Sequence, residues 1–210
     1  MTIADYASLQ TAMAAWLKRD DLTANIPDFI SLYEAQMNRD LMNMNPPHSS
    51  LEQTQTATLA TGTNPTLLAL PTGYKGTKRF QIQTSGNYYA LTYKTPEQMA
   101  EYSTSARSKF YTTNGQFLEI GAPPDTAYNY RWDYYKALSP LSSGVNWMIT
   151  NAPDLYLYGS LAHSAPFLKN DDRLQTWAAL YGALLKSVSM ENTRNRQGMA
   201  TLQVRSDVAF

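Results

Sequence analysis

The stretch YNYRWDY, residues 128–134, decides the fold class. Its aromatic residues occupy every second position, and Asn129, Arg131 and Asp133 stand between them. A period of two places the aromatic side chains on one face of a strand and the polar side chains on the other. This pattern is typical of an antiparallel strand with one buried face. It predicts that the middle of the chain is β-structure.

Short strands separated by turns are expected on both sides of this stretch. Turn sequences of Gly, Pro, Asn and Ser recur there, at 61–65, 71–73, 85–87 and 121–125. Asn114-Gly115 predicts a hairpin that joins strands at 110–112 and 117–120. One short helix is expected at 96–102. We therefore predict an antiparallel β-rich region over residues 49–141.

Helical patterns flank this region on both sides. Residues 5–19 and a second segment from Asn25, the expected N-cap, carry apolar stripes at helical spacing. A third helix is expected over 152–167, where small residues such as Gly159 let a neighbouring helix come close. A fourth helix is expected to start at Asp172, with Gln175 completing a capping box, and to end near Gly198. The residues expected in its core stripe are Leu174, Trp177, Tyr181, Leu184, Leu185 and Val188.

These patterns together predict an α+β fold with a discontinuous four-helix core, made of two N-terminal and two C-terminal helices, and an inserted antiparallel β-rich region. The expected domains are a helical core of residues 1–48 and 142–198, and an inserted domain of residues 49–141. An extended C-terminal tail is expected over residues 199–210, where the sequence alternates but has no neighbouring strand to pair with.

The composition favours contacts with other proteins. The chain of 210 residues has 17 basic and 17 acidic residues, and its charged fraction of 16 % is low. A strong basic excess, which drives phosphate neutralisation in nucleic-acid-binding proteins, is absent. The 15 tyrosines suit interfaces, because Tyr covers apolar area and keeps a polar group, although β-rich segments also use Tyr.

Motifs for chemistry are lacking in the sequence. There is no cysteine, and His48 and His163 stand far apart, so no metal or cofactor site is predicted. We expect His48 to be solvated in a proline-rich loop and His163 to be packed or interfacial. Ser160 lacks the glycine pattern of a nucleophile elbow. The acidic pairs at 20–21 and 171–172 stand at helix boundaries, where capping explains them. No catalytic residue is predicted.

Membrane insertion and secretion are not expected either. The first residues contain neither a basic region nor a long apolar run, as a signal peptide would. The most apolar stretch near the C-terminus is interrupted by His163, Pro166 and Lys169.

Several segments together resemble bacteriophage head-to-tail adaptor proteins. The most specific is NWMITNAPDLYLYGSL at 146–161, and the others are WLKRDDL at 16–22, IPDFI at 26–30, EAQMNR at 34–39, LPTGY at 70–74 and APFLKND at 165–171, followed by Trp177. They follow the family's order over nearly the whole chain. Leu41-Met42-Asn43 departs from the family, which often has a basic residue there, and the variable β region allows no residue-level comparison.

The resemblance implies a structural virion protein of the head–tail neck, assembled in the host cytoplasm. It implies a homo-oligomeric ring, a dodecamer, that docks under the portal protein and bridges it to a tail nozzle or tube protein. DNA would pass through the lumen without specific binding, which the neutral net charge suits. Such subunits are often monomers until the portal templates the ring.

Two sets of residues are candidates for these contacts. The alternating tail is expected to add a strand to an exposed portal edge, and its alternative is a disordered terminus. Its candidate portal-binding residues are Leu202, Val204, Arg205, Val208 and Phe210. The strand at 128–134 and the helix at 152–167 are favoured for contacts between subunits, with Tyr128, Tyr130, Trp132, Tyr156 and Tyr158 as the candidate residues.

Two other functions remain as alternatives. A carbohydrate- or wall-binding tail module would use the aromatic residues of the β region to stack on sugars, but it gives the helices no role. A hydrolase would need a pocket with converging ionisable groups, and the sequence offers no such cluster.

Overall fold

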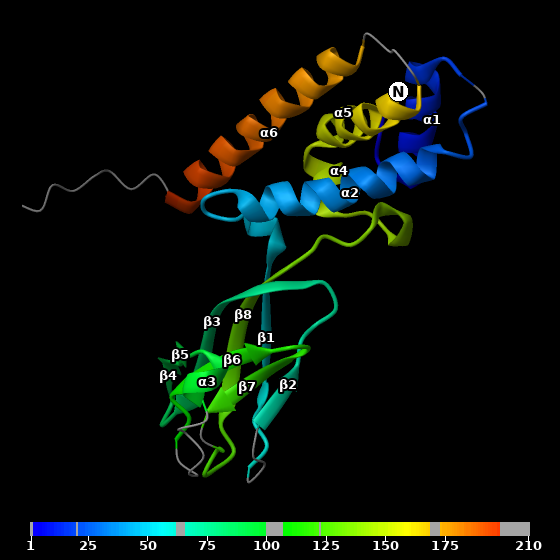
Figure 1. Cartoon of the computed structure of the whole chain (residues 1–210). Coiled ribbons are helices and arrows are strands. Elements are labelled where there is room, and N and C mark those ends of the chain that lie inside the picture. Colours follow the sequence, from blue (N-terminus) through cyan, green and yellow to red (C-terminus); the bar gives the residue numbers. More distant parts are fainter. Residues whose placement is uncertain are drawn as a thin grey trace, which may run out of the picture. The chain divides into compact units, whose positions relative to one another are not determined.

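A computed structural model describes residues 2–19, 21–61, 66–99, 107–121, 123–168 and 173–197. It is α+β, as the periodicities predicted. The chain divides into two compact units, a helical unit formed by the residues up to 50 and from 138 onward, and a β unit formed by residues 51–137. Figure 1 labels the elements of both units.

The helical unit is built around one central helix. Its helices are α1 (Tyr6–Leu17), α2 (Ile26–Asn43), α4 (Trp147–Asn151), α5 (Pro153–Ser164) and α6 (Leu174–Gln197), with 3₁₀ turns at Ser49–Leu51, Leu141–Ser143 and Ala165–Phe167. Helix α5 packs against α1, α2, α4 and α6. Its buried residues cover most of its circumference, as expected of a helix in contact with several others. The expected arrangement of four helices is not confirmed, because α4 is an additional helix.

Local chemistry explains where the first two helices begin. Asp5 caps α1, since its carboxylate accepts from the backbone N–H of Ser8 and the Ser8 hydroxyl accepts from the backbone N–H of Asp5. Helix α2 begins at Ile26 with Pro27 in its first turn, where the missing N–H costs nothing. The predicted capping by Asn25 is wrong, because its side chain makes no capping hydrogen bond.

Two predictions about the fourth helix need correction or fall outside the described residues. Leu174 was expected in the core stripe but is exposed, because the buried stripe of α6 is narrow and consists of Trp177, Tyr181, Val188 and Asn192. The predicted capping box at Asp172 and the C-cap at Gly198 lie outside the described residues, as do residues 100–102 of the short helix expected at 96–102.

The β unit consists of two four-stranded sheets. One has the strand order β1-β8-β3-β4, the other β2-β7-β6-β5. The strands are β1 (Glu52–Thr58), β2 (Thr66–Ala69), β3 (Tyr74–Thr84), β4 (Asn87–Ala90), β5 (Thr92–Tyr93), β6 (Phe110–Asn114), β7 (Phe117–Gly121) and β8 (Asn129–Lys136), with the short helix α3 (Pro96–Met99). All pairs are antiparallel except β5–β6, which is parallel.

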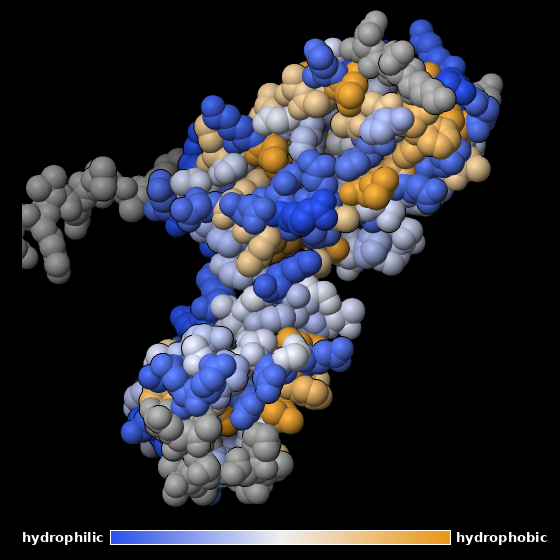
Figure 2. Space-filling view, in the orientation of Figure 1, coloured by the Kyte–Doolittle hydropathy of each residue, from blue (hydrophilic) through white to orange (hydrophobic). Residues whose placement is uncertain are grey.

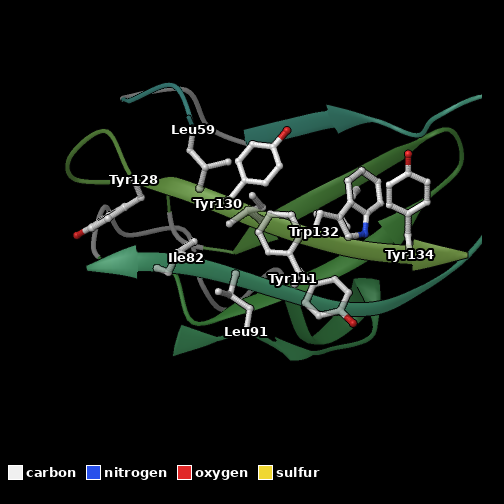
Figure 3. Close-up of a cluster of buried hydrophobic side chains, with 11 residues drawn as sticks. Leu59, Ile82, Leu91, Tyr111, Tyr128, Tyr130, Trp132 and Tyr134 are labelled. Carbon is white, nitrogen blue, oxygen red and sulfur yellow. The ribbon is translucent and has the colours of Figure 1, made fainter. Parts of the chain in front are cut away.

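The strand that decided the fold class lies inside its sheet. Strand β8 pairs with β1 on one side and β3 on the other. The aromatic residues of β8 lie in one buried cluster with Phe80 and Ile82 of β3 (Figure 3). This cluster also contains Tyr111, Leu118 and Ile120 of the second sheet. The predicted hairpin is confirmed, since Gly115 takes a positive φ of 60° between β6 and β7.

Candidate interaction surfaces

The central helix α5 touches α2 so closely that no side chain fits between them. A Cβ on Gly159 would lie 2.1 Å from the Tyr33 ring, and Tyr33 is completely buried. The prediction that a small residue at Gly159 admits a neighbouring helix is therefore confirmed. The close contact holds α2 and α5 as one rigid body, because packed interiors do not deform continuously.

Three tyrosines from three helices surround this contact. The Tyr33 ring meets the rings of Tyr156 and Tyr181 edge-on, with centroids 5.2 and 5.7 Å away. The Tyr181 hydroxyl donates to Asp40 Oδ2 at 2.5 Å, and the Tyr156 hydroxyl donates to Glu34 Oε1 at 2.9 Å. Burial, together with these carboxylates, raises the pKa of both hydroxyls well above the usual value for tyrosine. Both tyrosines therefore stay neutral and act as structural donors.

Polar side chains of α2 hold the segment that returns to the helical unit. Asn38 Oδ1 accepts from the backbone N–H of Leu138, and Glu34 Oε1 accepts from that of Leu141. Asn146, which caps α4, donates to the Ser139 carbonyl and to the Tyr156 hydroxyl. The sequence had not singled out these residues as functional. Two signals were available: each residue lies in a segment that resembles the adaptor family, and Glu34 and Asn38 lie at the edge of an apolar stripe.

The end of α6 is fixed to the loop that follows α2. Asn192 is buried; its Oδ1 accepts from the Ser49 backbone N–H, and its Nδ2 donates to the carbonyls of Pro46 and Pro47. Arg196 also donates to the Pro47 carbonyl at 2.6 Å. Asn192 continues the buried stripe of α6 four residues after Val188, a spacing that local reading of the sequence could have used.

His48 corrects an expectation, since it is buried and not solvated. Its Nδ1 lies 2.8 Å from Ser50 Oγ, and its ring packs 4.5 Å from the Trp147 ring, centroid to centroid. Burial and the charge of Arg196 lower the pKa of His48. His163 is packed as expected, half-buried, with Nε2 2.7 Å from Gln36 Oε1.

The outward face of the β1-β8-β3-β4 sheet carries an ion-pair cluster. Asp133 accepts from Thr54 at 2.7 Å, from Arg79 at 2.7 Å and from Arg131 at 3.1 Å. Burial acts to raise the pKa of Asp133, but these hydrogen bonds outweigh it and the pKa lies below its usual value. The cluster joins three strands, β1, β3 and β8.

Two hollows of the β unit, among the described residues, are open and lack charged residues. One, of about 310 Å³, is lined by Thr56, Ala57, Thr58, Gln83, Tyr88, Asn129 and Tyr130. The other, of about 390 Å³, is lined by residues 69–74 and 115–117. Neither brings ionisable side chains together, so neither has the groups that acid–base chemistry needs. Among the described residues, no group of three His, Cys, Asp or Glu side chains stands where it could hold a metal ion.

The aromatic residues predicted for subunit contact are mostly buried in the chain's own cores. Tyr128, Tyr130 and Trp132 lie in the β cluster, and Tyr156 lies within the helical unit. Tyr158 is half-buried, with its ring edge-on to Trp16 at 5.6 Å. Contact between subunits through these five side chains stays a prediction, and their burial directs attention to other surfaces. The predicted portal-binding residues 202–210 lie outside the described residues.

Apolar side chains are also exposed on the helical unit. On the face visible in Figure 2, hydrophobic residues of this unit lie as separate patches among hydrophilic ones. The exposed large apolar residues of the unit include Trp16, Leu32, Val145, Phe167, Leu174, Leu180 and Met190. In the part of the chain that is described, no helix has the length and apolar character needed to cross a membrane.

Comparison with known proteins gives a match over almost the whole chain. The family model described as SU10 adaptor protein matches residues 4–205. The match includes both helical ends and the entire β unit between them. None of the curated proteins matches the chain.

Proposed function

Since the chain belongs to the SU10 adaptor protein family, a family of structural bacteriophage head-tail adaptors, we propose that it is a ring subunit that joins the portal to the tail. The match over residues 4–205 carries this proposal. Membership implies a component of the virion neck that contacts portal and tail proteins, and the family is not a class of enzymes. The ring, its twelve copies, the passage of DNA and the assembly in the host cytoplasm belong to the proposal.

The helical unit has the properties that a connecting subunit needs. Its core is a rigid packing of α5 against α2 through Gly159 and Tyr33. Its polar groups, such as the buried Asn192 and the half-buried Glu34, hold loops in place. A rigid unit holds the surfaces for its two partners in a fixed relative position. It also loses little conformational entropy when it binds.

For portal contact we propose the C-terminal tail, which alternates in sequence and would add a strand to an exposed sheet edge of the portal. The residues proposed to make this contact are Leu202, Val204, Arg205, Val208 and Phe210. The distal partner is a tail nozzle or tube protein. The neutral charge of the chain supports a lumen that does not hold DNA tightly.

Electron microscopy of the full chain mixed with its portal tests the proposal. We expect a ring of twelve copies below the portal, formed from subunits that are monomeric alone. Deletion of residues 199–210 is expected to abolish portal binding and leave the helical circular dichroism signal unchanged. Portal binding by the truncated chain would refute the role of the tail, and absence of any ring would refute the proposed function.

A carbohydrate-binding role has one observation in its favour. The hollow beside Tyr88, a residue 44 % exposed, is lined by hydroxyl and amide groups of Thr58, Gln83 and Asn129. An exposed aromatic ring next to neutral polar groups suits a sugar. Binding of the full chain to a glycan array, lost in Tyr88→Ala, would support this second function. No binding to any glycan would dismiss it.

A further inference from the structure

Helix α6 carries a second stripe on a face that flanks its buried one. The residues are separated alternately by four and three positions, and all are exposed: Thr176, Leu180, Ala183, Ser187, Met190 and Arg194. This spacing is that of a seam against another helix. Leu180 and Met190 are 39 % and 55 % exposed, so a large part of their apolar surface is left uncovered by the described residues. We name this set the α6 seam.

Helix α2 carries a stripe with the same spacing. It consists of Asp28, Leu32, Ala35, Arg39 and Met42, of which Met42 is half-buried and the others are exposed. Leu32 is 55 % exposed. The buried stripe of α2 includes Phe29, Tyr33 and Met37, and Tyr33 contacts α5. The seam residues lie on the other side of the helix. We name this set the α2 seam.

The two seams can form one pair of opposite charges. Helix α2 as a whole holds three carboxylates and one cation, whereas α6 holds three cations and one carboxylate. In an antiparallel alignment the spacings of the two seams coincide, so that Leu32 faces Met190, Ala35 faces Ser187 and Met42 faces Leu180. The same alignment places Asp28 opposite Arg194. A parallel alignment places Asp28 opposite the uncharged Thr176, so charge favours the antiparallel register.

We propose that the α6 seam of one subunit packs antiparallel on the α2 seam of a second copy of this chain. This interface deepens the proposed ring function and rests on it. The contact joins two different surfaces, which is the condition for a cyclic ring with more than two members. Small residues at Ala35, Ala183 and Ser187 let the helix backbones approach, and Leu32 and Met190 supply the apolar contact.

Disulfide cross-linking tests the interface in a chain that has no cysteine of its own. In Leu32→Cys/Met190→Cys, mild oxidation of the portal-bound protein is expected to give a ladder of covalent oligomers on a non-reducing gel. Neither single variant can form this ladder, but a mixture of the two is expected to give a covalent dimer. A disulfide needs Cα atoms within about 7 Å, so the result is specific to the register.

The variant Leu32→Cys/Leu180→Cys is the matched control. In the proposed register its cysteines are ten positions, or about 15 Å, out of line, and no ladder is expected. A ladder in this control and none in the first variant would overturn the antiparallel register. Rings seen by electron microscopy without a ladder in either variant would overturn the interface and leave the proposed function standing. Absence of rings would overturn both.

Exchange of the charged pair gives an independent test. Asp28→Arg and Arg194→Asp each place like charges together, and each is expected to reduce the fraction of subunits in rings about tenfold. The double variant Asp28→Arg/Arg194→Asp restores opposite charges and is expected to recover ring formation. Equal loss in the double variant would refute the pairing. Both positions are exposed, and circular dichroism checks that the variants keep their helices.

Discussion

Replacement of Gly159 by alanine is expected to destabilise the helical unit, although alanine usually favours a helix. The new Cβ would lie 2.1, 2.3 and 2.7 Å from three atoms of the Tyr33 ring, where carbon atoms normally stay about 3.5–4.0 Å apart. The ring cannot turn away easily, because Tyr156 and Tyr181 pack against it. Helix α2 or α5 would therefore have to move by more than 1 Å (about 1.5 Å for ordinary contact).

The magnitude follows from two opposing terms. Overpacking a closely packed core costs up to about 3 kcal/mol, and alanine gains about 1 kcal/mol over glycine in a helix interior. The expected net loss is about 2 kcal/mol, which corresponds to a fall of about 4–8 °C in Tm for a chain of this size. Thermal unfolding followed by circular dichroism at 222 nm measures it.

Gly182 of α6 provides the matched control. It also lies inside a helix, but an added Cβ there meets no atom within 4 Å. Gly182→Ala is therefore expected to raise stability by about 0.5–1 kcal/mol. The reasoning would be refuted if Gly159→Ala were as stabilising as Gly182→Ala, because helix propensity would then outweigh the contact with Tyr33.

Three further changes separate polar groups that stabilise from those that do not. Tyr181→Phe removes the donor to a half-buried carboxylate of α2 and is expected to cost about 1.5–3 kcal/mol in urea denaturation. Tyr33→Phe removes a buried hydroxyl that has no hydrogen-bond partner among the described residues, and it is expected to be neutral or stabilising. Asn192→Ala is expected to cost about 2 kcal/mol, and Asn195→Ala, on the exposed side of α6, less than about 0.5 kcal/mol. Because the pKa of Asp133 is lowered in the fold, its carboxylate stabilises the β unit above about pH 4, and this contribution is lost as the pH falls through the lowered pKa. The difference in unfolding free energy between Asp133→Asn and the unchanged chain should therefore shrink in acid, and a constant difference from pH 7 to pH 2 would contradict this account.

The strand at 128–134 shows which features of the fold can be predicted from sequence. Its alternation is local, so the strand and its buried face follow from the residues themselves. The hairpin at Asn114-Gly115 is local too. The partners of β8 could not be predicted, because nothing in the strand specifies that β1 and β3 lie on its two sides. Pairing depends on segments that lie about fifty to eighty residues away.

His48 shows why a local prediction fails. A histidine after Pro46-Pro47 is expected in a solvated loop, and on its own that segment gives no other indication. In the fold, Asn192 and Arg196 of α6 bind the carbonyls of this loop, and Trp147 covers the histidine ring. The residues that bury it are about 100 to 150 positions distant in sequence. The hydrophobic periodicity of the sequence does not indicate such a long-range contact.

The candidate site was predicted incompletely for a similar reason. Aromatic residues such as Tyr156 suit interfaces and cores alike, and composition does not separate the two. In this chain most of the aromatic residues predicted for interfaces are buried in the core, and α5, which carries Tyr156, is surrounded by other helices. The two seams were not predicted from the sequence, because each contains small and polar residues, such as Ser187, and resembles an ordinary solvent-exposed helix face. Only the exposure of Leu32 and Met190 distinguishes them.

A ring of fixed size requires a fixed angle between the two surfaces that each subunit presents, about 30° per step for twelve copies. Both seams lie on helices that pack against α5, so the angle between them depends on the contacts of this central helix. Tyr33 and Tyr181 join α2, α5 and α6 at one point. Tyr33→Ala would remove the largest of these contacts and leave both seams intact. We expect such subunits to assemble on the portal less uniformly, with gaps or mixed ring sizes in electron micrographs. Uniform rings of unchanged size would mean that the portal alone sets the angle, and that rigidity of the helical unit is not needed for closure.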